Sequence, residues 1–255
     1  MELQQLFDLH GHTALVTGSS RGIGRAIALA LAQAGANIIV HGSHPSTQLA
    51  DALTEVKQYC PHAISVTADI ADADALHAML NTGRDEFGPL DILVLNASAQ
   101  AYQSLMDFTT DEFVRQYSAN VASAFTLMQA VLPSMQERGW GRILTIGSVN
   151  QWKPSPRLPI YASTKAAVAN LVVNCARQYS SYGITVNNLA PGVIRTDRNR
   201  EALQDEALCA TLLQSIPAGR FGTVEDCAGL AVLLCSNAGS YITGVDIPVA
   251  GGMQL

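Results

Sequence analysis

The stretch Thr17-Gly18-Ser19-Ser20-Arg21-Gly22-Ile23-Gly24 decides the fold class of this chain. A short apolar run at 14–17 leads into it, and an alanine-rich helical pattern at 25–32 follows it. Glycine allows a tight turn and a close approach of the backbone to a pyrophosphate, and a helix start offers free N–H groups to phosphates. The G-x-x-x-G-x-G spacing is wider than the G-x-G-x-x-G fingerprint, so an ordinary glycine-rich turn is the alternative. The flanking strand and helix favour a dinucleotide site.

Further apolar runs have the length of buried strands. They lie at 37–40, 64–68, 92–96, 142–146, 185–189 and 245–249. They are nearly all apolar rather than alternating, as expected for strands covered on both faces, and the segments between them are long enough for crossover helices. The pattern predicts an α/β fold: a Rossmann-type, doubly wound parallel sheet of about seven strands with helices on both faces. We find no linker or repeat, so we expect one domain over 1–255, with loops at 42–47, 151–160 and 193–200.

The bulk composition excludes several classes of partner. The 255 residues are 48% hydrophobic and 14% charged, with a net charge of -6 and no basic cluster, which argues against nucleic acid and acidic membranes. The five cysteines are widely spaced without a C-x-x-C pair, so we expect reduced thiols and no metal site. The chain shows neither a secretory leader nor an apolar run of the ~20 residues that a membrane span needs. These features predict a soluble, cytoplasmic protein.

The end of the second strand bears on the choice of cofactor. The segment Val40-His41-Gly42-Ser43-His44 contains no Asp or Glu, which would hold the adenosine ribose hydroxyls and favour NAD. An acid there would also repel a 2′-phosphate, so its absence predicts that NADP(H) is favoured over NAD(H). Arg21, Ser43 and His44 are candidate donors to that phosphate, unless they only face solvent. Asp69, after the third strand, is expected near the adenine, or is a simple turn aspartate.

Three residues further along carry the proton chemistry. Tyr161 and Lys165 are four apart, so on a helix they share one face. A nearby ammonium favours a phenolate over a phenol of pKa about 10, and Tyr161 could then act as general acid/base beside a hydride transfer. Ser148 directly follows the fifth strand, at the edge where such sheets bind ligands, and its hydroxyl can bind the substrate oxygen.

With these motifs in this order, the chain resembles the short-chain dehydrogenase/reductase family over its whole length, in its compact branch. The resemblance implies Ser148, Tyr161 and Lys165 as catalytic residues, with Lys165 also on the nicotinamide ribose and Asn120 supporting a proton-relay water. It places the segment Pro191-Gly192-Val193-Ile194-Arg195-Thr196 beside the nicotinamide. The predicted cofactor set is Gly18, Ser20, Arg21, Gly22, Ile23, Gly24, Ser43, Asp69, Ile70, Asn96, Tyr161, Lys165, Pro191, Gly192, Ile194 and Thr196.

Two segments depart from the family pattern. The Asn-Asn-Ala-Gly that usually follows the fourth strand is Leu95-Asn96-Ala97-Ser98, where Ser98 replaces a glycine and alters local backbone freedom. The usual Asp-Gly-Gly near the C-terminus is Ala250-Gly251-Gly252. Neither change touches the residues assigned to proton transfer.

The substrate is less clearly encoded. The loops expected around the pocket carry Gln151, Trp152, Lys153, Arg157, Arg195, Asp197, Arg198 and Arg200. This polar, partly basic set predicts a small hydroxylated or anionic substrate of sugar or sugar-acid type, although such side chains often only face solvent. The alternatives are a 3-oxoacyl thioester reductase and, from another class, a catalytically silent dinucleotide-sensing protein. A purely structural oligomer component leaves the glycine turn unexplained.

The helix expected around 161–179 is apolar on more than one face, which predicts burial on both sides. The family resemblance implies that pairing of such helices builds a homodimer and usually a homotetramer.

Overall fold

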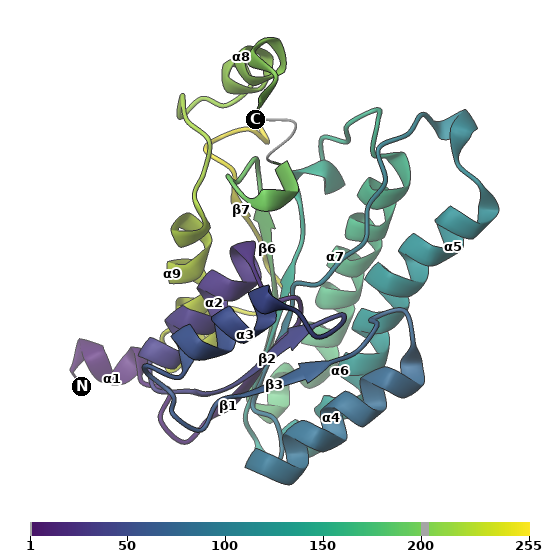
Figure 1. The fold of residues 1–255 in the computed structure, drawn as a ribbon. Helices are drawn as coiled ribbons and strands as arrows, with labels where there is room; N and C mark the ends of the chain where they lie inside the picture. Colours follow the sequence, from purple (N-terminus) through teal and green to yellow (C-terminus); the bar gives the residue numbers. More distant parts are fainter. Residues whose placement is uncertain (1, 200–203) are drawn as a thin grey trace.

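A computed structural model describes residues 2–199 and 204–255, and its centre is one parallel sheet (Figure 1). The strands are β1 (Thr13–Val16), β2 (Asn37–Gly42), β3 (Ile64–Thr67), β4 (Ile92–Leu95), β5 (Gly141–Ile146), β6 (Ile184–Pro191) and β7 (Asp246–Val249). Their order is β3-β2-β1-β4-β5-β6-β7, and every neighbouring pair is parallel. The predicted Rossmann-type fold is confirmed, and each strand lies within two residues of its predicted position.

Helices cover both faces of this sheet. They are α1 (Leu3–Phe7), α2 (Gly22–Gln33), α3 (Thr47–Val56), α4 (Ala73–Phe87), α5 (Thr110–Tyr117), α6 (Ser123–Arg138), α7 (Pro159–Tyr179), α8 (Glu206–Gln214) and α9 (Val224–Cys235). In Figure 1, α2, α3 and α9 lie on one side of the sheet, and α4, α6 and α7 lie on the other. None of the helices in the described part of the chain combines the length and apolarity needed to cross a membrane.

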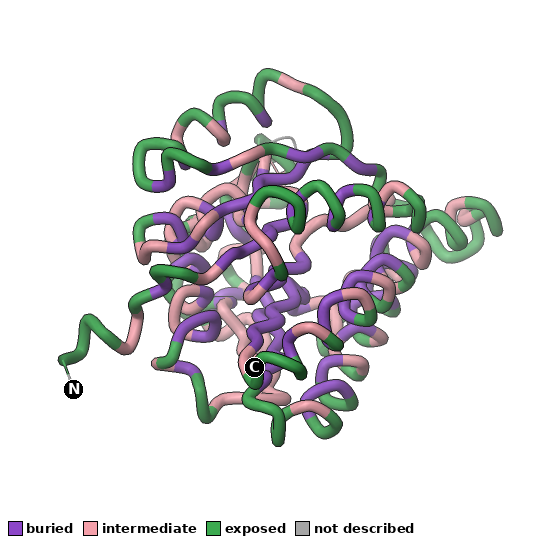
Figure 2. Tube along the Cα trace, turned by 90° about the horizontal axis from the view of Figure 1, so that it is seen from below, coloured by how far each residue is buried: buried purple, intermediate pink, exposed green. Residues whose placement is uncertain are grey.

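Two hydrophobic cores follow from this arrangement, because successive side chains of a strand point to opposite faces. In β1, Ala14 and Val16 pack with α2, α3 and α9, whereas Leu15 packs with α4, α6 and α7. The burial colours of Figure 2 show the same pattern, with buried residues inside and exposed residues along the outer helix faces. Burial on both faces explains why the strands read as continuous apolar runs.

The order in which the strands are added reverses between β1 and β4, because β1 pairs with β2 on one side and with β4 on the other. Chains that leave β1 and β4 therefore diverge, and this switch point is where open α/β sheets bind ligands. Gly18, Asn96, Ser148 and Gly192 all follow strand ends at this same edge. The fold thus brings four distant segments of the sequence to one site.

The predicted loop 151–160 is partly wrong. A 3₁₀ turn covers Val149–Gln151, and α7 already begins at Pro159. Proline suits the first helical position, because its missing N–H has no intrahelical partner there and its φ is already helical. Tyr161 therefore lies in the first turn of α7, where the neighbouring loops can reach it.

Candidate active site

In the turn between β1 and α2, two of the three glycines, Gly18 and Gly24, leave no room for a side chain. Gly18 and Gly22 have φ values of +64° and +59°, the left-handed region that favours glycine. A Cβ on Gly24 would lie 2.4 Å from Asn96 Nδ2 and 2.5 Å from the Gly18 carbonyl oxygen. The backbone is therefore exposed to any ligand on this turn, and α2 begins directly at Gly22.

Asn96 holds this turn in place from the end of β4. Its Nδ2 donates to the carbonyl oxygens of Thr17 at 2.9 Å and Gly18 at 3.0 Å. The Thr17 hydroxyl in turn accepts from the backbone N–H groups of Asn96 and Ala97. Asn96, predicted to contact the cofactor, thus uses its side-chain N–H groups on the turn itself.

His41 also holds the glycine turn in place, a role that the sequence did not reveal. Its Nδ1 accepts from the Gly18 N–H at 2.9 Å, and its Nε2 lies 3.0 Å from the Ala68 carbonyl oxygen. A carbonyl only accepts, so the ring is neutral with its proton on Nε2. Burial lowers the pKa of His41, and the bond to Ala68 opposes that shift. In the sequence, His41 follows the apolar run at 38–40, and a polar residue in that position is the feature that could have indicated its role.

We expect His41 to make the fold sensitive to acid. Its pKa in the folded protein lies below the ordinary 6.5, so the unfolded chain binds the proton more readily. This contribution to the free energy of unfolding is therefore complete above pH 6.5 and is lost as the pH falls below it. Urea unfolding between about pH 5 and pH 7.5 should show this loss in the wild type and less of it in His41→Asn, which keeps an acceptor for Gly18. His62→Gln, an exposed histidine, is the control. An unchanged pH slope in His41→Asn would contradict the prediction.

The residues predicted for the adenosine end are mostly at the surface. Arg21 precedes α2 as its exposed N-cap, Ser20 is half-buried, and Ser43 is exposed with its hydroxyl 2.9 Å from His44 Nδ1. Asp69 accepts from the Ala71 N–H at 2.9 Å, as a turn aspartate does, and its place near the adenine stays a prediction. The neighbouring Ile70 lines a small pocket that also touches Thr17, Asn120 and Lys165.

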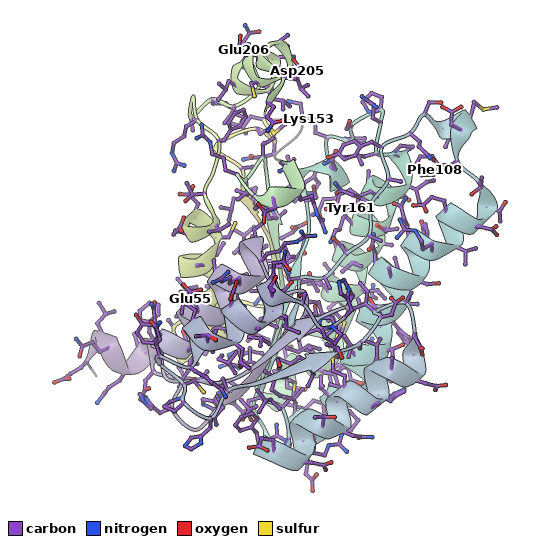
Figure 3. The ribbon with its side chains drawn as sticks, in the orientation of Figure 1. Glu55, Phe108, Lys153, Tyr161, Asp205 and Glu206 are labelled. Carbon is purple, nitrogen blue, oxygen red and sulfur yellow. The ribbon has the colours of Figure 1, made fainter. Side chains whose placement is uncertain are left out.

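Ser148, Tyr161 and Lys165 come together at the carboxyl edge of the sheet and are all buried. Tyr161 is hydrogen-bonded to Ser148, and the Lys165 ammonium lies 5.5 Å from the centre of the Tyr161 ring. Lys165 Nζ also donates to the Ile146 carbonyl oxygen at 2.7 Å. Figure 3 shows Tyr161 at the upper end of the sheet, at the start of α7. The predicted trio is thus one cluster.

The electrostatics of this cluster correct one expectation. We expected Lys165 to lower the pKa of Tyr161, but burial raises that pKa, against opposing effects of Arg198 and the Ser148 hydrogen bond. Burial and the Arg198 charge lower the pKa of Lys165 to about 7. Lys165 is therefore partly neutral near pH 7 and is a weak partner for a phenolate in the free chain.

Asn120 sits in a π-helical turn, Ser118–Ala122, a local irregularity common at functional sites. Its Oδ1 accepts from the Ala99 N–H at 2.7 Å, and its Nδ2 donates to Ala99 O and Thr164 Oγ1, both at 2.9 Å. Asn120 therefore ties the loop after β4 to α7 and borders the pocket that contains Lys165.

Asn150 lies beside Ser148, a contact that the sequence did not reveal. Its backbone N–H and its Nδ2 both donate to Ser148 Oγ, each at 3.2 Å. With its lone pairs occupied, the Ser148 hydroxyl is left with its proton to donate. Asn150 thus orients Ser148 as a donor.

Behind Ser148 lies a polar network that also escaped the sequence analysis. Gln151 accepts from the Ser148 N–H at 3.3 Å and donates to Asp246 of β7. Asn188 of β6 donates to Asp246 at 2.7 Å. Burial raises the pKa of Asp246. Gln151, expected near the substrate, therefore joins the loop after β5 to β6 and β7.

The segment after β6 lies across the glycine turn. A Cβ on Gly22 would lie 3.5 Å from Thr196 Cγ2. Pro191 ends β6, the Gly192 N–H donates to the Val249 carbonyl oxygen, and Ile194 is buried. These predicted cofactor residues therefore lie at the switch point together with the turn.

Of the charged loop residues that the structure describes, Arg198 acts on the proton-transfer pair through its charge, which lowers the pKa of both groups. Lys153 Nζ donates to the carbonyl oxygens of Met253 and Leu255, both at 3.2 Å, and Arg157 is exposed. Arg195 stacks over the Phe221 ring. Arg200 lies outside the described residues. Figure 3 places Lys153 near α8 rather than beside Tyr161.

Comparisons with known proteins agree on one family. A family model described as enoyl-(acyl carrier protein) reductase matches residues 18–254. Gluconate 5-dehydrogenase of Gluconobacter oxydans (strain 621H) is 36% identical over 255 residues, covering 100% of this chain and 99% of that protein. A 3-oxoacyl (acyl-carrier-protein) reductase from Agrobacterium tumefaciens C58, solved with NADP bound, aligns with TM-score 0.94 and 39% identity over 99% of this chain and 98% of that one. A gluconate 5-dehydrogenase from Burkholderia cenocepacia J2315 in complex with NADP and tartrate aligns with TM-score 0.92 and 33% identity, covering 99% and 98%.

A parallel sheet whose strand order reverses between β1 and β4, with a glycine turn after β1, is typical of dinucleotide-binding α/β proteins. With relatives that match it over its full length, the chain belongs to the short-chain dehydrogenase/reductase family. It is an NAD(P)-dependent oxidoreductase that acts on CH–OH groups.

Proposed function

We propose that this protein interconverts a secondary alcohol and a ketone with NADP(H), and that its substrate is a polar, hydroxylated or anionic compound of sugar-acid type. The observation that carries the reaction is the buried Ser148–Tyr161–Lys165 cluster at the switch point of the sheet. One domain, 1–255, would carry both the cofactor and the catalytic residues.

The residues around the glycine turn fit a dinucleotide. Bare backbone at Gly18, Gly22 and Gly24 admits a pyrophosphate, and the first N–H groups of α2 supply donors for it. Thr196 and Ile194 lie across the turn, and Lys165 and Ile70 border the pocket beyond it. When bound, NADP(H) supplies the hydride chemistry at the substrate carbon. Several relatives are described with NADP bound, and no acid follows β2, which supports NADP(H) over NAD(H).

The chain's own residues would manage the proton and the oxygen. In the oxidation direction the phenolate of Tyr161 accepts the substrate hydroxyl proton, and in reduction the phenol returns it to the nascent alkoxide. Ser148, oriented by Asn150, donates a hydrogen bond to the same oxygen. Lys165 stabilises the phenolate when it is charged.

Two other functions compete. The 39% identity to a 3-oxoacyl (acyl-carrier-protein) reductase supports thioester reduction as the alternative substrate class. A dinucleotide sensor without turnover is the alternative of another class, although a sensor needs only the glycine turn. A screen of hydroxy acids, sugars and 3-oxoacyl thioesters, with both cofactors and in both directions, separates the three. We expect turnover of a hydroxy acid with NADP(H), whereas cofactor binding without any turnover would favour the sensor.

We further propose a homodimer or homotetramer. Apolar side chains remain exposed on neighbouring helices α5, α6 and α7, including Phe113 (41%), Phe125 (53%) and Val173 (43%). Exposed apolar patches of this kind mark interaction surfaces. Light scattering at micromolar concentration should report a dimer or tetramer, and Phe125→Glu should shift the protein towards monomer, unlike Lys57→Glu on the exposed surface of the other helical layer. A wild type that is a stable monomer would contradict the proposal.

A further inference from the structure

Arg198 is an exposed side chain that links the segment after β6 to Ser98 in the loop after β4. It lies in a 3₁₀ turn, Asp197–Asn199, after β6. Its Nη1 donates to Ser98 Oγ at 3.0 Å, and its Nη2 donates to the Ser98 carbonyl oxygen at 2.9 Å. Ser98 follows β4 and stands where the family pattern has glycine. One of the two groups that hold Arg198 is thus the hydroxyl by which this chain departs from the pattern, and the other is a backbone carbonyl that a glycine would also offer.

Through Ser98 the guanidinium is tied to the proton-transfer pair, because the next residue, Ala99, is hydrogen-bonded to Asn120, which donates to Thr164 beside Lys165. Its charge lowers the pKa of both Tyr161 and Lys165. Two of its five N–H groups are used on Ser98. Within residues 2–199 and 204–255, no carboxylate forms an ion pair with Arg198. The Arg198 guanidinium and the Lys165 amine thus belong to one site, and no carboxylate among the described residues pairs with Arg198 there.

We propose that Arg198, oriented by Ser98, binds the carboxylate of an anionic substrate whose alcohol carbon lies at Tyr161. This inference rests on the proposed function and names the residue that recognises the acid. A planar guanidinium held by two bonds keeps a rigid fork for a carboxylate, and charge-assisted bonds of this kind are strong. Lys153 is occupied by the C-terminal carbonyls, and Arg157 has no described link to Tyr161. Arg198 is therefore the cation that the geometry favours.

The test compares two ligands of similar shape, of which one carries a charged carboxylate and the other a neutral carboxamide: gluconate and gluconamide. Arg198→Gln should lower kcat/KM for the acid by about 10- to 100-fold, the range for a lost charge-assisted bond, and change the amide by less than about 3-fold. Arg198→Lys should keep part of the preference, because it keeps charge but loses the fork. Ser98→Ala should lower kcat/KM for the acid about 3- to 10-fold through looser positioning of Arg198.

Binding gives a readout that needs no turnover. Calorimetry on the NADP(H)-loaded protein should show gluconate or tartrate binding weakened by Arg198→Gln to the same extent as kcat/KM, with the Kd of NADPH unchanged. Arg157→Gln removes the same charge from the loop that the sequence favoured and should have the smaller effect on acid binding.

Several results would overturn the inference. Equal losses of kcat/KM for the acid and the amide would show that Arg198 only holds the loop after β4. A comparable loss of NADPH affinity would place Arg198 on the cofactor phosphates. A larger effect of Arg157→Gln would identify Arg157 as the recognition residue. A wild type that binds no hydroxy acid overturns it as well. Binding of the acid that depends on Arg198 without turnover would instead uphold this inference and overturn the proposed function.

Discussion

Tyr161→Phe should lower kcat by at least about 100-fold, the usual scale for loss of a general acid/base, and leave the Kd of NADPH nearly unchanged. The substitution removes the transferable proton but keeps the ring of a buried residue, which is 7% exposed and has the Lys165 ammonium 5.5 Å from its ring centre. Steady-state rates and fluorescence titration of NADPH measure the two effects separately.

Tyr182→Phe is the matched control for this experiment. Tyr182 is an exposed tyrosine on the 3₁₀ turn after α7 and should tolerate the loss of its hydroxyl without a change in kcat. Comparable activity of Tyr161→Phe and the wild type would remove Tyr161 from the mechanism.

Ser43→Asp should reverse the cofactor preference. We expect the wild type to have a higher kcat/KM with NADP(H), and the new carboxylate to lower that value by roughly 100-fold, because like charges brought together cost several kcal/mol. It should also improve the use of NAD(H) by offering an acceptor to the ribose hydroxyls. Ser43 is the better position, since it is exposed, whereas a Cβ on Gly42 would lie 3.2 Å from Leu49.

Gln58→Asp adds the same charge just beyond the far end of α3 and controls for net charge. It should leave the preference unchanged. A wild-type enzyme that already favours NAD(H) would show that the missing acid after β2 does not decide the cofactor in this chain.

The fold could be predicted because its signals are local. Most strands are largely apolar runs, and the glycine turn marks the first crossover, so most strand positions followed from burial on both faces. The cluster of Ser148, Tyr161 and Lys165 also followed, because strand ends and helix spacing fix where such residues meet. Pro159 misled us, since proline ends a helix in one context and begins one in another.

The supporting contacts could not be predicted, because they join residues far apart in the sequence. His41 meets Gly18 across two strands, Asn96 turns back onto Thr17, and Arg198 reaches Ser98 over 100 positions. The pKa values of Tyr161 and Lys165 also depend on how deeply the two side chains are buried, which their spacing of four residues in the sequence does not reveal. Ser98 was recognised as a departure, but its role needed the position of Arg198.

Transfer of a deuterium label tests the central claim most directly. A hydroxy acid deuterated at the carbinol carbon is incubated with the protein and NADP⁺, and the reduced nicotinamide is analysed by mass spectrometry. The account predicts that the deuterium moves to the cofactor in the wild type and that Tyr161→Phe transfers it at least about 100-fold more slowly. Label released to water, or no transfer by a protein that binds both ligands, would contradict it.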